Sequence, residues 1–258
     1  MQKFLSLLTA MLIFLSPAFA RDLRFIQVTD VMYKSSEETN FEKVIDDINK
    51  QPNVEFVVFT GDNIAKPDKE ELKAFLLTAK KLKRPYYIVI GDRDVSKRKD
   101  LSKKDYAKFV RRYTKKYKTS TPNYVFEKKG IVFIVADGAK DVITSKMGYY
   151  KDDVLEWLDA NLDLYASKPV IILQHFPIVP PSERESHYTF KADKYLELLT
   201  KHKNVKAVVS GHFGVNKEQE VNGITHISTA PAPSYRVIDI LDYDTETPTI
   251  WAEVKNAK

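Results

Sequence analysis

The sequence predicts an α/β fold in which two β-sheets pack between helices. Two observations carry this prediction. Apolar, β-branched runs alternate with amphipathic helical segments through the first half of the chain, and short strands joined by tight turns fill much of the second half. We find no internal repeat, linker or low-complexity segment, so residues 21–258 are expected to form one domain.

The first half of the chain alternates strand and helix signals. Phe41, Val44, Ile45 and Ile48 recur at the spacing of one helical face, whereas the strand segments are continuous apolar runs. The expected order is strand 24–28, helix 40–50, strand 54–59, helix 68–83 and strand 86–90. This repeat of strand and crossover helix predicts a largely parallel sheet that is covered on both faces.

The second half begins with a hairpin signal, because Lys128-Lys129-Gly130 separates two strand segments. The expected elements are strands 123–127 and 131–136, helix 151–165, strand 169–173, helix 191–202, and strands 205–209, 224–228, 235–241 and 249–254. We expect the last three strands, which short turns join, to form an antiparallel run.

Residues 1–20 have the pattern of a secretory signal peptide. Lys3 precedes an apolar run over 4–15, and Ala18 and Ala20 provide a signal-peptidase site. The run is too short for an ordinary transmembrane helix, although an uncleaved membrane anchor stays an alternative. We therefore expect a mature protein that starts at Arg21 and is exported, to the periplasm or outside the cell. The chain has no cysteine, which excludes thiolate chemistry and leaves stability to the core.

Positive charge is concentrated in one segment. Residues 97–118 contain eleven Lys or Arg and two Asp, a net charge of +9, so the rest of the +6 chain carries −3. This segment could steer an anionic substrate or contact an anionic surface, and a solvated helix face is the alternative. Nothing in the sequence predicts a specific nucleic-acid partner, and it leaves the oligomeric state open.

Five short motifs follow apolar runs in one order along the chain. They are Asp30-Val31-Met32, Gly61-Asp62-Asn63, Gly91-Asp92-Arg93-Asp94, Gln174-His175 and Gly211-His212-Phe213-Gly214. Side chains just beyond the carboxyl ends of several strands converge on one crevice, and carboxylate and imidazole are ligands for divalent or transition metals. A single aspartate after a strand is more often a turn residue or a helix cap. Five such residues at strand ends favour a metal site.

The order of these motifs resembles the calcineurin-like metallophosphoesterase family, whose pattern is Asp-x-His, Gly-Asp, Gly-Asn-His-Asp/Glu, His and Gly-His-x-His. Val28-Thr29-Asp30, Thr60-Gly61-Asp62 and Gln174-His175-Phe176-Pro177 are similar to its cyclic-nucleotide-phosphodiesterase-like branch. The resemblance covers nearly all of residues 21–258. It implies a four-layer αββα sandwich of two mixed β-sheets flanked by helices, with metal ions between the loop ends of the sheets.

The departures from the family pattern fall on one of the two metal sites. The resemblance assigns Asp30, Met32, Asp62 and Gly214 to the first site, where the family has two histidines at the positions of Met32 and Gly214. It assigns Asp62, Asp92, His175 and His212 to the second site, which is complete and has Asp92 in place of an asparagine. A thioether is a poor ligand for Mn, Fe, Zn or Mg. One bound metal is therefore expected rather than two, with Asp30 as a possible weak ligand.

Arg93 stands where the family has a histidine that is thought to contact phosphate or the leaving group. Its guanidinium stays charged, so it could clamp a substrate phosphate or fill the first metal position and pair with Asp30; an outward-facing arginine is the third alternative. Asp30 is expected to orient or deprotonate the attacking water. His187, in a polar loop after the His175 strand, is the candidate for a substrate-side role.

The resemblance and the retained ligands together predict an exported, metal-dependent phosphoesterase that hydrolyses small phosphomonoesters or phosphodiesters. The alternative is a catalytically inactive descendant that binds phosphorylated ligands or serves in the cell envelope. The complete second set favours the enzyme, since a cluster of buried charges is costly to keep without a cation.

Overall fold

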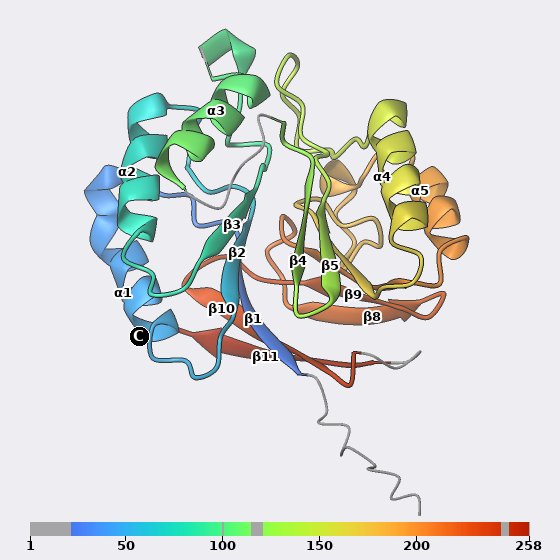
Figure 1. Cartoon of the computed structure of the whole chain (residues 1–258). Coiled ribbons are helices and arrows are strands. Elements are labelled where there is room, and N and C mark those ends of the chain that lie inside the picture. The colour runs from blue at the N-terminus through green and yellow to red at the C-terminus, as the bar shows by residue number, and fades with distance from the viewer. Residues whose placement is uncertain (1–21, 100, 115–120, 244–247, 258) are drawn as a thin grey trace, which may run out of the picture.

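Two β-sheets pack face to face, and helices cover the outer face of each (Figure 1). The computed structural model describes residues 22–99, 101–114, 121–243 and 248–257. The expected four-layer αββα sandwich is confirmed. The segment interpreted as a signal peptide, residues 1–20, lies outside the described residues. Within them, no helix has the length and apolarity that crossing a membrane requires.

The first sheet has five strands in the order β11-β10-β1-β2-β3. The bounds are Leu23–Val28 for β1, Phe56–Thr60 for β2, Tyr86–Val89 for β3, Ser234–Leu241 for β10 and Thr249–Asn256 for β11. The three strands from the first half of the chain run parallel, while β10 and β11 are antiparallel additions. Every residue of β2 and β3 is buried, as their continuous apolar runs require.

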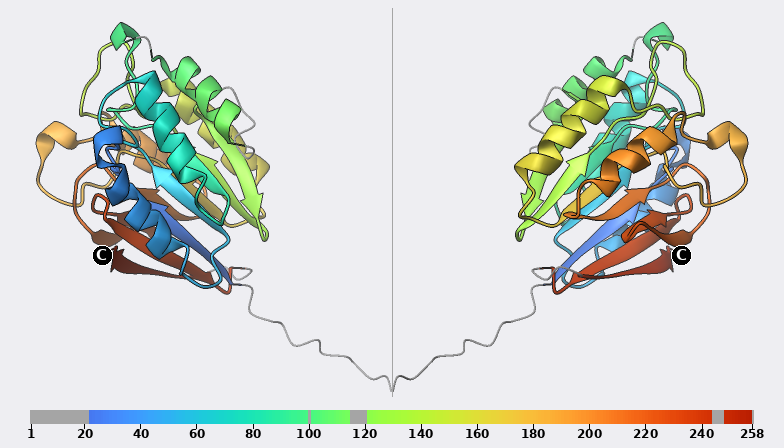
Figure 2. Two further views of the ribbon diagram at one scale, coloured as in Figure 1. Left: turned by 90° about the vertical axis from the view of Figure 1, so that its left-hand side faces the viewer. Right: turned by 90° about the vertical axis from the view of Figure 1, so that its right-hand side faces the viewer.

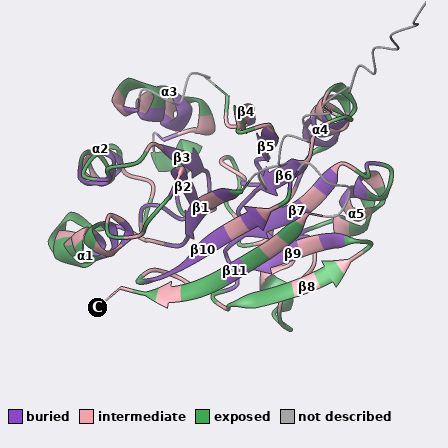
Figure 3. Cartoon of the chain, turned by 60° about the horizontal axis from the view of Figure 1, so that its bottom comes forward, coloured by how far each residue is buried: buried purple, intermediate pink, exposed green. Residues whose placement is uncertain are grey.

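The second sheet has six strands in the order β4-β5-β6-β7-β9-β8. The bounds are Tyr124–Lys128 for β4, Ile131–Val135 for β5, Val170–Leu173 for β6, Val205–Ser210 for β7, Lys217–Val221 for β8 and Ile224–Ser228 for β9. The four strands β5, β6, β7 and β9 are parallel, and each edge strand is antiparallel to its neighbour. Figure 3 shows that β8 and β11 expose most of their residues.

Three helices cover the first sheet and two cover the second, as Figures 1 and 2 show from three sides. The bounds are Glu38–Ile48 for α1, Lys69–Ala79 for α2, Lys103–Tyr113 for α3, Asp152–Leu164 for α4 and Ala192–Thr200 for α5. Short 3-10 turns occupy Ser35–Glu37 (η1), Lys97–Lys99 (η2) and Glu185–His187 (η3). Asp68 caps α2 and Ser102 caps α3 through side-chain acceptors, which satisfies amides that the first turn leaves free.

Aromatic side chains join the two sheets through the middle of the sandwich. Phe25 and Phe56 of the first sheet stack with ring centroids 5.0 Å apart, and Phe133 of the second sheet meets both edge-on at 5.6 and 5.0 Å. Each such pair adds about 0.5–1.5 kcal/mol beyond the burial of its apolar area.

A buried polar side chain also joins the sheets. The Gln27 side chain, on β1, donates to Thr60 Oγ1 on β2 and to the Ser210 carbonyl on β7, both at 2.8 Å. Its carbonyl oxygen accepts from Thr229 Oγ1 at 2.6 Å. The Gln27 amide is fully buried and has partners in both sheets.

Two expectations for the second half were wrong or incomplete. The strands at 224–228, 235–241 and 249–254 do not form one antiparallel run, because β9 joins the second sheet in parallel with β7 while β10 and β11 pair in the first. The polar strand β8 carried no apolar signal and was missed. The basic segment of the first half contains helix α3, which the expected order of elements did not include. Its buried residues are only Tyr106, Ala107 and Val110, so its apolar face is narrow, in line with the alternative of a solvated helix face.

Candidate metal centre

The five acidic and histidine side chains of the sequence motifs come together where the two sheets' parallel strands end. Asp30, Asp62 and Asp92 follow β1, β2 and β3 of the first sheet, while His175 and His212 follow β6 and β7 of the second. All except Asp92 are buried, and the Asp92 side chain is 12% exposed. The structure therefore brings the five residues together at the edge of the fold that the sequence pattern indicated.

Three donor atoms form a small triangle on one side of the centre. His175 Nε2 lies 3.4 Å from Asp92 Oδ1, His212 Nδ1 lies 3.2 Å from the same oxygen, and the two imidazole nitrogens are 3.1 Å apart. Neighbouring ligands around one ion with bonds of about 2.0–2.2 Å lie about 3.0–3.6 Å apart. These three residues thus have both the chemistry and the spacing of ligands to one metal ion.

A backbone carbonyl orients His175 for this role. The Thr60 carbonyl lies 2.8 Å from His175 Nδ1, and a carbonyl can only accept, so Nδ1 carries the proton. In the neutral ring Nε2 then keeps its lone pair and faces the other donors. Such an outer hydrogen bond fixes the tautomer of a metal-binding histidine.

Asp62 borders the triangle and binds Arg93. Its Oδ1 lies 3.5 Å from His175 Nε2 and accepts the Arg93 amide at 2.9 Å, while its Oδ2 pairs with Arg93 Nε at 3.2 Å. The Arg93 side chain is 45% exposed. The Nε of Arg93 therefore faces the centre, while the end of its side chain reaches solvent. One alternative expected Arg93 to pair with Asp30, but its partner is Asp62.

Asp30 is fixed by two hydrogen bonds to one of its oxygens. Oδ2 accepts from Thr29 Oγ1 at 2.8 Å and from the His212 amide at 3.0 Å. Asp30, Asp62 and His175 also have ligand atoms within 4.8 Å of one another, so they form a second possible group of donors that shares His175 with the triangle.

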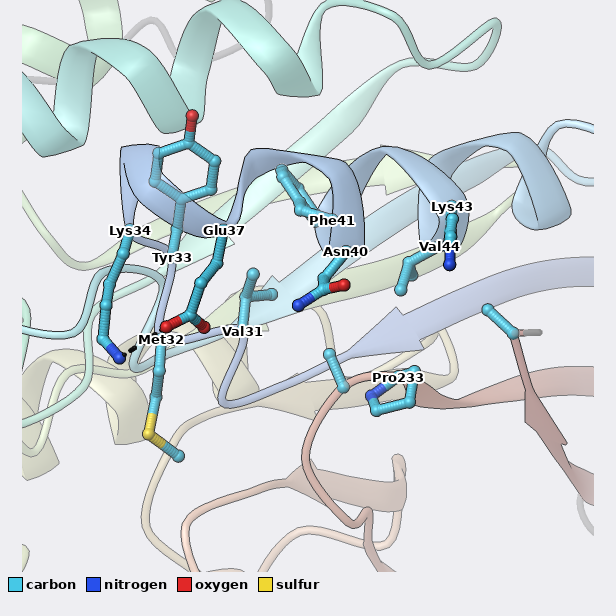
Figure 4. Close-up of a pocket in the computed structure, with 12 residues that line it drawn as sticks. Val31, Met32, Tyr33, Lys34, Glu37, Asn40, Phe41, Lys43, Val44 and Pro233 are labelled. Carbon is cyan, nitrogen blue, oxygen red and sulfur yellow. Dashed lines mark hydrogen bonds and ion pairs between the residues drawn. The ribbon is translucent and has the colours of Figure 1, made fainter.

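The half of the centre that holds Asp30 and Asp62 has no imidazole at the two positions where the resemblance expects one. The Met32 amide donates to the Asp62 carbonyl at 2.8 Å, which keeps the backbone of Met32 beside the centre. Its side chain instead lines a cavity of about 380 Å³ between α1 and the Pro233 turn (Figure 4). Gly214 offers no side-chain ligand at all.

The turns that carry these residues need special backbone conformations. Asp30, Met32, Asp62 and His212 all have positive φ, between +46° and +71°. Such residues are uncommon outside glycine, and their strain is typical of functional sites. Gly61 is required for a further reason, because a Cβ there would lie 2.4 Å from His175 Nδ1.

Asp94 supports the centre in a way that the sequence did not reveal. It is fully buried and accepts the amides of Gly91, Asn63 and Ile64 at 2.8, 2.8 and 3.1 Å. Its carboxylate also accepts from Asn63 Nδ2 at 2.9 Å. Asp94 thereby ties the turn that holds Asp62 to the turn that holds Asp92. Its place in the Gly91–Asp94 motif was the available signal.

Burial and neighbouring charges act on these groups in opposite directions. Burial raises the pKa of Asp62 well above its usual value, and the Asp92 and Asp30 carboxylates add to this rise although His175 opposes it. Burial would raise the pKa of Asp92 as well, but the close imidazoles of His175 and His212 lower it below its ordinary value. Burial would lower the pKa of His175, yet the surrounding carboxylates raise it to about 10. The centre concentrates negative charge that a cation would stabilise.

His187 lies beside the triangle. Its ring centroid is 4.8 Å from that of His212, and Ser186 Oγ is 2.9 Å from its Nδ1. Burial, followed by the charge of His212, lowers the pKa of His187 to about 4, so the ring is neutral near pH 7. The structure thus places His187 beside the candidate centre, and its substrate-side role stays a prediction.

The residues present fit a metal ion on one side of the centre. Asp92 Oδ1 and His212 Nε2 are buried and make no hydrogen bond to any described residue. Orphaned buried polar atoms are costly, and a cation bound by the triangle would engage Asp92 Oδ1 directly. The ligand assignment to Asp62, Asp92, His175 and His212 remains a prediction that the geometry makes specific.

Comparisons with known proteins agree on one family. The model of the calcineurin-like phosphoesterases matches residues 23–216. A probable glycerophosphodiester phosphodiesterase, GpdQ, of Arcobacter nitrofigilis is 26% identical over 227 residues, which are 82% of this chain and 79% of that protein. A dimetal phosphatase from Danio rerio shares the fold, with a TM-score of 0.65 at 14% identity over 92% of this chain and 99% of its own.

Two further solved structures share the fold. A purple acid phosphatase from yellow lupin seeds has a TM-score of 0.61 at 12% identity, over 92% of this chain and 52% of its own. GAP50, the anchor in the inner membrane complex of Plasmodium, has a TM-score of 0.58 at 14% identity, over 92% of this chain and 89% of its own. The match over residues 23–216 places the chain itself in the calcineurin-like phosphoesterase family, and it is therefore a metal-dependent hydrolase of phosphoric ester bonds.

Proposed function

We propose that the protein is an exported phosphoesterase that works with one firmly bound divalent or transition metal ion. The observation that carries this proposal is the triangle of Asp92, His175 and His212, whose donor atoms are 3.1–3.4 Å apart, opposite a half that lacks the two histidines of the family pattern. Asp62 is the fourth donor at its edge. Mn, Fe, Zn and Mg are all compatible with this mixture of carboxylate and imidazole.

When bound, such an ion polarises a phosphoryl oxygen and lowers the pKa of a bound water. The chain's own residues supply the rest. Asp30, held by Thr29 and the His212 amide, orients the attacking water and accepts its proton. Arg93, anchored on Asp62 and open to solvent, holds the phosphoryl oxygens through its guanidinium and stabilises the charge that develops on them.

We infer small phosphorylated compounds as substrates and place phosphodiesters first. The related protein from Arcobacter nitrofigilis is described as a glycerophosphodiester phosphodiesterase, which supports this order. Phosphomonoesters remain in the proposal, because the centre as described contains nothing that would require a second ester group. His187, neutral near pH 7 and next to His212, lies where it would contact the substrate.

Metal content and turnover, measured together, test the proposal. Purified protein should retain about one metal ion per chain after dialysis, and should hydrolyse an aryl phosphodiester in a manner that chelation abolishes and metal restores. Two tightly retained ions per chain would contradict the one-metal proposal. Export is tested separately, by the amino-terminal residue and the compartment of the protein recovered from its cells; an intact residue 1 in the cytoplasm would contradict it.

A second function, binding without catalysis, is favoured by one specific observation. In the half that lacks the two histidines of the family pattern, a guanidinium already pairs with Asp62. The Plasmodium anchor protein supports the idea that this fold can serve in assembly. One bound metal without turnover on a panel of phosphomonoesters and phosphodiesters would favour this function over the enzyme.

A further inference from the structure

We propose that one rim of the molecule docks onto an anionic phospholipid surface. The rim has two parts. The apolar tip is Val142 and Ile143, in the loop between β5 and α4, and the basic rim consists of the exposed Lys97, Arg98, Lys99, Lys104 and Lys146. The proposal concerns binding and does not depend on catalysis.

The apolar tip consists of two adjacent exposed side chains. Ile143 is 73% exposed and Val142 is 56% exposed, and the two are adjacent in the chain. Single exposed apolar residues are normal on a soluble protein, but two adjacent β-branched residues in one loop expose a larger, continuous apolar area to water. Such a tip can insert into the boundary between headgroups and acyl chains.

Hydrogen bonds hold the apolar tip beside the basic rim. The Lys97 amide donates to the Asp141 carbonyl at 2.7 Å, and the Lys103 amide donates to Asp141 Oδ2 at 3.1 Å. Asp141 directly precedes the tip. Figures 1 and 2 show the segment leading into α3 and the loop after β5 side by side at one end of the molecule.

Charge complementarity identifies the partner. The Asp141 carboxylate accepts the Lys103 amide, whereas Lys97, Arg98 and Lys99 are consecutive, exposed and basic. Each Lys or Arg near an anionic bilayer raises binding by about fivefold. Apolar insertion adds to this attraction only at a surface that has an acyl layer, which a soluble polyanion does not provide. The combination therefore fits an anionic bilayer better than a nucleic acid.

The rim also borders the candidate metal centre. Gly148, at the end of the same loop, accepts the Phe190 amide at 2.8 Å and forms a bridge with Thr189. This contact ties the loop to the segment that carries His187, whose ring packs on His212. Docking through the rim would bring the centre close to the membrane surface.

Vesicle sedimentation tests the proposal on the full chain as it is purified. Wild-type protein should bind vesicles of phosphatidylcholine mixed with phosphatidylglycerol at least about tenfold more strongly than vesicles of phosphatidylcholine alone, and added salt should weaken binding. Neutral vesicles control for any insertion by residues 4–15, because that insertion does not require anionic lipid. Equal binding to both vesicle types would overturn the proposal.

Two variants separate the parts of the rim. Val142→Ser combined with Ile143→Ser should lower binding to anionic vesicles about tenfold or more, and Lys97→Gln, Arg98→Gln and Lys99→Gln together should lower it about 10²-fold. Controls outside the rim are Leu164→Ser, which is 72% exposed, and Lys50→Gln with Lys201→Gln and Lys203→Gln. Melting temperature and hydrolysis of a soluble aryl phosphodiester should be unchanged in all of them.

A soluble polyanion provides the opposing outcome. If double-stranded DNA competes fully with the vesicles and the serine variant binds both as the wild type does, the basic rim binds polyanions through charge alone and the membrane proposal is overturned.

Discussion

The two halves of the candidate metal centre compensate buried negative charge by different means. In the complete half, Asp92 lies between two imidazoles, and donor atoms stand at the separations of ligands to one ion. In the depleted half, Asp30 and Asp62 lack the two histidines of the family pattern, and Arg93 pairs with Asp62 instead. The difference teaches that a guanidinium can pair with a buried carboxylate where a metal's histidines are missing, while the raised pKa of Asp62 shows that this pairing offsets only part of the cost of burial.

The largest expected effect comes from removing the ligand that both halves share. His175→Ala should abolish metal retention and lower turnover about 10³-fold, since the ion's stabilisation of the transition state is worth several kcal/mol. Metal analysis and aryl phosphodiester kinetics measure this. His202→Ala is the matched control, because His202 is a buried histidine that pairs with Asp159, away from the centre. Normal metal content in His175→Ala would show the ligand assignment to be wrong.

Substitution of Arg93 tests whether the depleted half contributes to catalysis. Arg93→Ala should lower kcat about 10²-fold, as loss of one preorganised donor does, and Arg93→Lys should recover only part of it because the planar fork is absent. Arg84→Ala is an exposed control outside the centre. If Arg93→Ala instead raised metal content towards two ions per chain, the guanidinium would be a stand-in for an ion rather than a contact to substrate.

Met32→His tests the comparison from the opposite direction. An imidazole at this position should raise the affinity for a second ion at least about tenfold, because even residues that only hydrogen-bond to a metal's ligands change metal affinity by that factor. Calorimetric titration of Mn²⁺ into metal-free protein measures it. Met32→Leu, which keeps the volume without a donor, should leave the titration unchanged. Unaltered stoichiometry and affinity in Met32→His would mean that the missing ligand is not the only feature that prevents metal binding in the depleted half.

His226 shows what burial alone does to an imidazole, for comparison with the histidines of the centre. It is a buried imidazole outside the centre whose Nε2 has no partner among the described residues. Burial lowers its pKa to about 4 in the folded state, against about 6.5 unfolded. Its contribution to stability is therefore intact above pH 6.5 and is lost as the pH falls towards 4.

Relative to His226→Gln, the wild type should lose about 2 kcal/mol of unfolding free energy between pH 7 and pH 5. Urea unfolding at both pH values measures this difference, and activity at pH 7 should not change. Parallel losses in the two proteins would show that His226 is less desolvated than its surroundings indicate.

The strand-end placement of the centre was predictable because it follows from local pattern. A buried apolar run followed by Gly-Asp or His specifies both the strand and the side chain at its end, and parallel strands bring those ends together. The partners of Arg93, Asp94 and His175 were not predictable, since they depend on left-handed turn residues such as Asp62 and on the Thr60 carbonyl. The sheet to which β9 belongs was missed for a related reason: strand pairing is a long-range choice that local propensity does not encode.

The buried Gln27 amide fixes the position of one sheet relative to the other. Apolar faces of two sheets attract each other without regard to small displacements, because burial depends on area rather than direction. Gln27 binds Thr60 in its own sheet and Ser210 in the other, so a slide of one sheet past the other would break directional bonds inside the protein. Three aspartates of the centre follow strands of one sheet, and its two histidines follow strands of the other. The Gln27 contact therefore fixes the distance between these two groups of side chains and, with it, the range of ions that they can hold.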